Sequence, residues 1–260
     1  MSYENILYTV EGKAAVITIN RPKALNALNF TTMDEILDGV RKAAADKNVF
    51  GLILTGAGEK AFIAGADITE MAKMHPIEAK AFADKGHHVG EAIETIPKVV
   101  IAAVNGFALG GGCEVALACD LILASNKARF GQPEVNLGVI PGFGGSQRLP
   151  RRVGLGAAGK LIYTGDIIDA TEALRIGLAD EMLAPEELLP RAKAFVEKIA
   201  TKGPVAIGAA KEAMRRGAAM SMGDALSLES QHFSWLFATE DQKEGMAAFI
   251  EKRTANFKGR

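Results

Sequence analysis

The chain has 260 residues, of which 48% are hydrophobic, and its formal net charge at pH 7 is −1. This length suits one large domain or one domain with an appendage, and the apolar share is ample for a core without disulfide or metal crosslinks. The near-zero net charge excludes the global basic surface that is typical of nucleic-acid-binding proteins.

The cysteines and the lengths of the apolar runs indicate the cellular compartment of the protein. Cys113 and Cys119 lie within one predicted helix, at a spacing that is typical of neither a disulfide framework nor a metal site. We therefore expect two buried free thiols. No apolar run has the length of a membrane span, and residues 1–4 lack the charge and apolar core of a signal peptide. These features favour the cytoplasm of a bacterium, with no membrane partner.

The N-terminal region alternates between strand and helix patterns. Residues 6–10 and 14–19 alternate in polarity around a Gly-Lys pair, which predicts a hairpin. Residues 30–45 then place apolar side chains on one helical face, with Thr31 or Thr32 as the cap. Buried strands follow at 51–55 and, further along the chain, at 99–104. Such alternation indicates an α/β fold of repeated ββα units with mostly parallel pairing.

Two glycine-containing segments interrupt this pattern. Residues 61–69 read AFIAGADIT and precede a helix predicted from Pro76 to Ile96; the pattern alone indicates a plain strand-to-helix connection. Residues 139–145 form a glycine- and proline-rich loop before a short helix that begins at Gln147. This loop has neither the Lys-Ser/Thr of a phosphate loop nor the glycine spacing of a dinucleotide-binding turn, which argues against nucleotide binding of those types.

The strongest chemical signal lies after the strand at 99–104. Gly110, Gly111 and Gly112 precede a helical segment of small apolar residues, so that backbone N–H groups at the helix start can face an anion or a developing oxyanion. Glu114 lies in the first turn of that helix, where burial would raise its pKa.

A second carboxylate, Glu134, follows Glu114 after 20 residues. Two glutamates beside an oxyanion donor provide the groups that acid–base chemistry next to a carbonyl requires. Taken alone, each has an ordinary structural interpretation: Glu114 as a helix N-terminal acid and Glu134 as a solvated loop residue. Their spacing does not choose between these interpretations.

The C-terminal part changes in style. Consecutive helical patterns run from Glu186, Pro204 is expected to begin one helix, and Thr239 is expected to cap the last. We expect a boundary near 195–203, which divides the chain into an α/β core at 1–197 and a helical region at 198–260.

Several ordered motifs resemble the crotonase (enoyl-CoA hydratase) superfamily, and the resemblance extends through essentially the whole chain. They are Asn20-Arg21-Pro22, Ala24-Leu25-Asn26-Ala27-Leu28, Ala64-Gly65-Ala66-Asp67-Ile68, the glycine run with Glu114, Gly131-Gln132-Pro133-Glu134, Pro141-Gly142, Gly144-Gly145 and Phe249-Ile250-Glu251-Lys252-Arg253. Within that superfamily, glutamate at both 114 and 134 is typical of the hydratases. The resemblance implies a spiral of ββα units, with C-terminal helices that support trimers, which often pair into hexamers.

The resemblance also assigns roles. It implies that the N–H groups of Ala66 and Gly111 form an oxyanion hole and that Glu114 and Glu134 are the catalytic acid–base pair. Its substrate would be an acyl-CoA thioester, with no separate cofactor and no metal. Residues expected to contact CoA are Ala24, Leu25, Ala64, Asp67, Ile68 and Thr69, with Phe233 and Lys252 from a neighbouring subunit.

The implied reaction is reversible hydration of a short-chain trans-2-enoyl-CoA, such as crotonyl-CoA, to the (3S)-3-hydroxyacyl-CoA. The nearest alternative is a 3,2-enoyl-CoA isomerase of the same fold, which typically uses one of the two glutamates. A non-catalytic acyl-CoA-binding or RNA-binding relative is a further alternative, although both glutamates are present and no lysine-rich helix face is evident.

Overall fold

The computed structural model describes residues 3–260; Met1 and Ser2, the first residues of the segment that lacks a signal-peptide pattern, lie outside the described residues. The main sheet has six strands in the order β1-β2-β3-β5-β7-β10. The predicted hairpin is confirmed: β1 (Ile6–Glu11) and β2 (Ala14–Ile19) pair antiparallel across a two-residue turn. The other strands of this sheet all pair in parallel: β3 (Gly51–Gly56), β5 (Val99–Val104), β7 (Leu121–Ser125) and β10 (Glu181–Leu183).

A second sheet has four short strands in the order β4-β6-β8-β9. They are β4 (Ala61–Ile63), β6 (Phe107–Leu109), β8 (Arg129–Gly131) and β9 (Ile167–Asp169). The chain repeatedly adds one strand to the main sheet, the next to the small sheet, and then one or two helices. The predicted ββα repetition is therefore confirmed.

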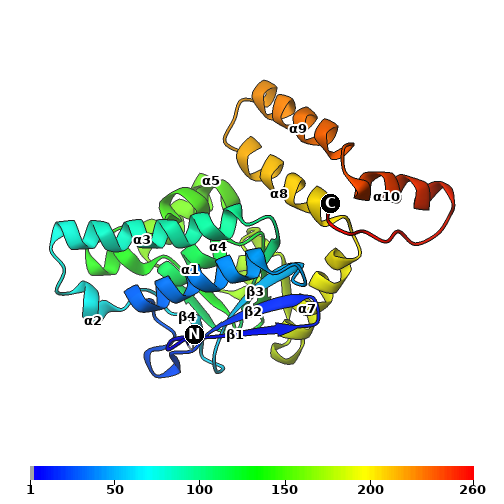
Figure 1. Ribbon diagram of the computed structural model, residues 1–260. Coiled ribbons are helices and arrows are strands. Elements are labelled where there is room, and N and C mark those ends of the chain that lie inside the picture. The colour runs from blue at the N-terminus through cyan, green and yellow to red at the C-terminus, as the bar shows by residue number, and fades with distance from the viewer. Residues whose placement is uncertain (1–2) are drawn as a thin grey trace.

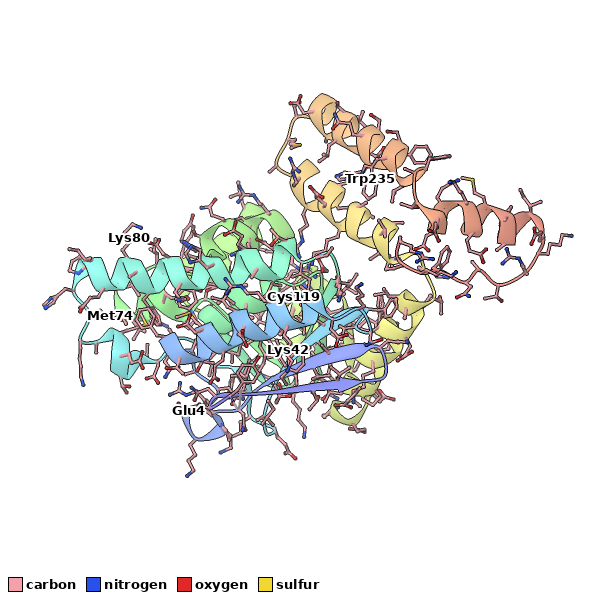
Figure 2. The ribbon with its side chains drawn as sticks, in the orientation of Figure 1. Glu4, Lys42, Met74, Lys80, Cys119 and Trp235 are labelled. Carbon is pink, nitrogen blue, oxygen red and sulfur yellow. The ribbon has the colours of Figure 1, made fainter. Side chains whose placement is uncertain are left out.

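Helices cover both faces of the main sheet (Figure 1). The helices of the body are α1 (Phe30–Ala45), α2 (Ile68–Met71), α3 (Pro76–Thr95), α4 (Gly111–Ala118), α5 (Gly145–Thr164), α6 (Ala170–Arg175) and α7 (Pro185–Ala200), with 3-10 turns η1 (Pro22–Ala24) and η2 (Pro133–Leu137). Because side chains alternate along a strand, Leu52 and Leu54 pack toward the helices α1, α3 and α4, whereas Ile53 packs against α7. Both cysteines are buried and free, as predicted, and Figure 2 shows Cys119 inside the body.

Two helix starts differ from the sequence predictions. Asn29, rather than either threonine, caps α1: its side chain accepts from the backbone N–H of Thr32 at 2.9 Å and from the Thr32 hydroxyl at 2.6 Å. Asparagine and threonine are both good caps, and the extended backbone at Asn29 decides between them. The predicted short helix at Gln147 begins instead at Gly145 and extends to Thr164, with a kink at Gly154 that divides it.

The last three helices are α8 (Pro204–Gly217), α9 (Met222–Leu236) and α10 (Glu240–Ile250), and α9 and α10 project away from the body (Figure 1). Pro204 begins α8 and Thr239 caps α10, as predicted. Residues 201–203 join α7, which packs on the sheet, to α8. The division of the chain into two domains stays a prediction. Across residues 3–260, no helix combines the length and apolar character that a membrane span requires.

Candidate active site

Close packing explains the glycine run that opens α4. Gly110 has φ 48° and ψ −122°, a left-handed conformation that strains residues with a side chain. A Cβ atom on Gly110 would lie 2.8 Å from Oε1 of Glu134, and one on Gly112 would lie 1.9 Å from the backbone oxygen of Ile63. The glycines therefore let α4 start directly against β4 and next to Glu134.

Two residues whose backbone N–H groups lack a partner among the described residues line one cavity near the start of α4. Gly111 is the first residue of α4, so its N–H has no partner within the helix. Ala66 lies opposite Leu28 in an isolated β-bridge, but the residues on either side of Ala66 make its two hydrogen bonds. Leu28 N–H donates to the oxygen of Gly65 at 2.9 Å, and Asp67 N–H donates to the oxygen of Leu28 at 2.7 Å. Within residues 3–260, neither the Ala66 nor the Gly111 N–H donates to a protein acceptor. Both residues line the same cavity of about 330 Å³.

Glu114 is almost fully buried, with 2% of its surface exposed. Its Oε1 accepts from the N–H of Phe143 at 2.8 Å and from the N–H of Gly145 at 2.6 Å. Gly145 is the first residue of α5, so this carboxylate lies at the positive end of that helix. Burial raises the pKa of Glu114 to about 7, the two N–H bonds oppose the rise, and the charge of Glu134 adds to it. Oε2 accepts no hydrogen bond from the described residues, in contrast to Oε1.

Glu134 lines the same cavity from η2. Burial raises its pKa above the ordinary range. The fully buried side-chain amide of Gln132, oriented with its nitrogen toward Glu134, donates to Oε1 at 2.9 Å and to Oε2 at 3.1 Å. The sequence analysis gave Gln132 no role, although its place two residues before the carboxylate was a possible signal. Its amide holds Glu134 toward the cavity.

The remaining wall of the cavity is apolar. It consists of Ala64, Gly65, Ile68, Met71, Ala79, Phe82, Ala83, Leu109, Gly110, Pro133, Leu137, Val139, Ile140, Gly142 and Phe143. Among the described residues that line it, Glu114 and Glu134 are the only ones with ionisable side chains. An apolar wall with two carboxylates and two free N–H donors suits a ligand that carries one polar reacting group on an apolar chain.

The predicted CoA contacts of the body fall into two groups. Ala64 and Ile68 line the cavity. Asp67 and Thr69 lie outside it: Asp67 accepts from Thr69 and pairs with Arg21 at 3.0 Å, and these contacts lower the pKa of Asp67. Asp67 thus ties two adjacent loops together.

Ala24 and Leu25 lie at the end of η1 and directly after it. Leu25 lines a separate hollow of about 390 Å³ with Lys23 and Lys60, and its backbone oxygen accepts from Ala64 N–H at 3.1 Å. This hydrogen bond places the hollow beside the cavity wall. The predicted contact of Leu25 with CoA is compatible with this position.

The structure places Phe233 and Lys252 away from the cavity. Phe233 is an exposed residue of α9 whose ring packs on Phe237 at 5.2 Å, and Lys252 follows α10 with φ 55°. Neither lines the cavity of its own chain. Their predicted contact with a neighbouring subunit's ligand stays a prediction.

Over the part of the chain that the structure describes, no group of three or more His, Cys, Asp or Glu side chains could hold a metal ion. That the reaction uses no metal and no separate cofactor stays a prediction.

Comparisons with known proteins agree over the whole length. The family model for enoyl-CoA hydratase/isomerase matches residues 9–260. The chain is 53% identical to a crotonyl-CoA hydratase of Syntrophomonas wolfei, a match that covers 99% of each chain. It is also 53% identical to a short-chain-enoyl-CoA hydratase of Clostridium acetobutylicum, over 97% of each.

Solved structures match the fold equally well. The crystal structure of an enoyl-CoA hydratase from Bacillus anthracis is 40% identical and has a TM-score of 0.95, covering 99% of this chain and all of that one. An enoyl-CoA hydratase subunit from Geobacillus kaustophilus is 41% identical with a TM-score of 0.94, and the match covers 99% of each chain. The spiral of ββα units is therefore the fold of these relatives.

Proposed function

The chain belongs to the enoyl-CoA hydratase/isomerase family, and we propose that it hydrates short-chain trans-2-enoyl-CoA thioesters reversibly, with crotonyl-CoA as a substrate. One observation carries this assignment. Glu114 and Glu134 face the same apolar cavity as the unpaired N–H groups of Ala66 and Gly111. An isomerase needs one such carboxylate, whereas addition of water uses one to activate the water and one to protonate carbon.

The oxyanion hole acts on the thioester. Its oxygen accepts hydrogen bonds from the N–H groups of Ala66 and Gly111, which stabilise the enolate-like charge that forms as C3 is attacked. Because this charge is larger in the transition state than in the substrate, the hydrogen bonds lower the barrier and do not merely tighten binding.

The two carboxylates divide the proton transfers. Glu114 takes a proton from water on Oε2, since Oε1 already accepts from Phe143 and Gly145. The resulting hydroxide adds to C3, and Glu134 gives its proton to C2 on the same face, which yields the (3S)-3-hydroxyacyl-CoA. Burial raises the pKa of both carboxyl groups, and the charge of Glu134 adds to the rise at Glu114, so that the two titrations are coupled. This reaction moves protons and hydroxide only and therefore needs no redox cofactor.

We also propose that the C-terminal helices form the contacts between subunits and complete the CoA site of a neighbouring subunit. Large apolar side chains of α9 and α10 are exposed, including those of Phe233, Trp235, Phe249 and Ile250. A patch of this kind is typical of a protein–protein contact. It supports a homo-oligomer, a dimer of trimers in which Phe233 and Lys252 contact the CoA bound by a neighbour.

The test follows the enoyl-thioester absorbance of crotonyl-CoA. We expect the wild-type protein to consume it, and Glu114→Gln and Glu134→Gln each to lose at least about a hundredfold in kcat, the scale of a general acid–base contribution. A folded wild-type protein that binds CoA yet leaves crotonyl-CoA unchanged would contradict the proposal. Isomerisation of 3-enoyl-CoA would then be the next assay.

A further inference from the structure

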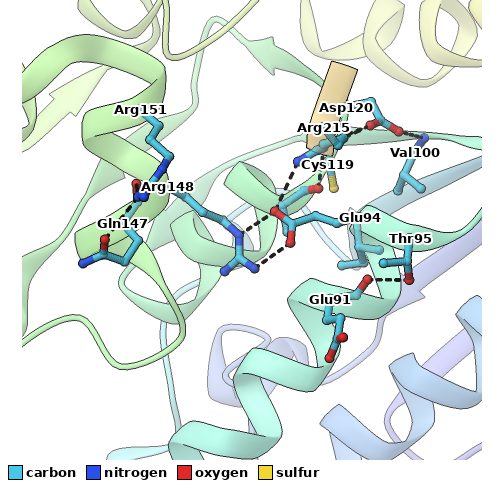
Figure 3. Close-up of polar contacts among 12 residues, drawn as sticks. Glu91, Glu94, Thr95, Val100, Cys119, Asp120, Gln147, Arg148, Arg151 and Arg215 are labelled. Carbon is cyan, nitrogen blue, oxygen red and sulfur yellow. Dashed lines mark hydrogen bonds and ion pairs between the residues drawn. The ribbon is translucent and has the colours of Figure 1, made fainter. Parts of the chain in front are cut away.

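Arg148, in the first turns of α5, makes polar contacts with two segments at once. Its Nε and Nη2 donate to Oε1 and Oε2 of Glu94 on α3, at 2.8 and 2.9 Å (Figure 3). Its Nη1 donates to the backbone oxygen of Phe143 at 2.8 Å. Two parallel hydrogen bonds to one carboxylate fix the plane of a guanidinium. The Nη1 donor of Arg148 is therefore held in one direction, toward the loop before α5.

Phe143 is the residue through which Arg148 reaches the active site. Its backbone oxygen accepts from Arg148, and its backbone N–H donates to Oε1 of Glu114. Its ring packs 5.3 Å from that of Phe82 and leaves no room for a side chain at Gly86, where a Cβ atom would lie 2.1 Å from the ring. The ring and the backbone oxygen of Phe143 are thus both fixed, which aims its N–H at Glu114.

Glu94 is itself held by more than Arg148. Arg215 of α8 reaches Oε1 of Glu94 at 3.2 Å and Asp120 at 3.0 Å (Figure 3). The charged groups around Glu114 are therefore Glu134 from η2, Arg148 from α5, and, behind Arg148, Glu94 and Arg215. Of these, Glu134 raises the pKa of Glu114 and Arg148 lowers it.

We propose that Arg148 is a positioning residue for Glu114, which it orients through the peptide backbone of Phe143 without touching the substrate. This inference rests on the proposed function, because it gives Arg148 a part in the proton transfer at Glu114. The competing explanation is structural: the Arg148–Glu94 ion pair would only join α5 to α3. The two explanations differ in what they predict for the titration of Glu114.

The first experiment compares Arg148→Met with Arg148→Lys. Arg148→Met removes a positive charge and the hydrogen bond that orients Phe143, both of which oppose the effects of burial and of Glu134, so that the pKa of Glu114 rises. We expect Arg148→Met to lower kcat about tenfold to a hundredfold, with KM for crotonyl-CoA within about twofold of wild type. The acid limb of its kcat/KM profile moves to higher pH. Arg148→Lys keeps the positive charge but loses the paired hydrogen bonds to Glu94 that orient the guanidinium. We expect the acid limb of its kcat/KM profile to return toward that of the wild type, while kcat stays low.

Arg152 offers a matched control one turn further along α5. It pairs with Asp180 at 2.8 Å and donates to the backbone oxygen of Leu178 at 2.8 Å, so it has the same kinds of contact away from the cavity. We expect Arg152→Met to lower Tm to a degree similar to Arg148→Met, with kcat and the acid limb unchanged. Equal kcat and equal acid limbs in the two methionine variants would overturn the inference.

A readout without turnover separates this inference from the proposed function. The carboxyl ¹³C resonance of Glu114, assigned by its loss in Glu114→Gln, is titrated in wild type and in Arg148→Lys and Arg148→Met. We expect the midpoint to rise in the methionine variant. Activity of the wild type with an unmoved midpoint would refute the role of Arg148 alone, whereas an inactive wild type with a moved midpoint would refute the hydratase assignment alone.

Discussion

Helices α4 and α9 show two ways in which this chain uses apolar residues. All eight residues of α4 are buried, whereas none of the fifteen residues of α9 is. Yet α9 also carries large apolar side chains, among them Leu226, Phe233 and Trp235, which remain exposed. A helix that is apolar all round finds its partners within the fold, and an exposed apolar face requires a partner from outside it.

The difference follows from what surrounds each helix. α4 begins between β4 and the start of α5, where its own glycines permit the contact. α9 packs chiefly against α8, with Trp235 near that helix (Figure 2). The first environment holds the Glu114 carboxylate nearly free of water, and the proposed chemistry lies there. The second environment is suited to assembly.

The largest expected effect tests the packing of α4. Gly112 and Gly223 are each the second residue of their helix, and an added Cβ would meet Ile63 at 1.9 Å in α4 and nothing within 4 Å in α9. We expect Gly112→Ala to lower the free energy of unfolding by about 3 kcal/mol or more, because the backbone of β4 cannot move away. Gly223→Ala should leave it unchanged or raise it by about 0.5–1 kcal/mol. Urea unfolding of both variants checks this; equal stabilities would contradict it.

The second effect tests the cost of charge inside α4. The pKa of Glu114 rises from 4.5 to about 7, which corresponds to about 3 kcal/mol. As the pH rises, Glu114 ionises in the unfolded chain before it ionises in the folded one. The loss of folding stability is therefore absent below pH 4.5, grows between pH 4.5 and about pH 7, and is complete above about pH 7. We therefore expect Glu114→Gln to be more stable than wild type at pH 8, with the difference vanishing as the pH falls to 4.5.

Unfolding by urea at pH 8 and pH 5 measures the Glu114→Gln prediction. Glu244 gives the opposite sign, because Arg253 lowers its pKa to about 2. Glu244→Gln should therefore gain no stability at high pH. A Glu114→Gln variant whose advantage is independent of pH would show that the two N–H donors offset the burial of the charge in full.

The sequence could predict the elements whose partners lie nearby in the chain. The hairpin at residues 6–19, the strands at 51 and 99 and the cap at Thr239 follow from local polarity and turn residues, and the structure confirms them. Glu114 and Glu134 stood out by residue type and by resemblance. The structure places them on one cavity with Ala66 and Gly111, although these residues are distant in sequence.

Contacts between distant residues could not be predicted from the sequence. Arg148 and Glu94 are separated by 54 positions, and no local pattern distinguishes this arginine from its neighbours in α5. Gln132 is polar and fully buried, which a sequence read locally would not suggest beside a proline. Asn29 shows a smaller failure of the same kind, since Asn29, Thr31 and Thr32 all suit a cap and the backbone conformation selects one of them.

The smallest expected effect concerns the exposed face of α9 and α10. Phe249 is 86% exposed, and we expect it to be buried between subunits, so Phe249→Ser should weaken each subunit contact by about 2 kcal/mol. Ile77, the second residue of α3, is 85% exposed and serves as the control, because the start of α3 lies at the opposite end of the molecule from α10 (Figure 1). Light scattering over a dilution series should show dissociation of Phe249→Ser at a higher concentration than wild type or Ile77→Ser. If the two serine variants dissociate alike, the exposed face of α10 is no assembly surface, and the contrast between α4 and α9 reduces to burial alone.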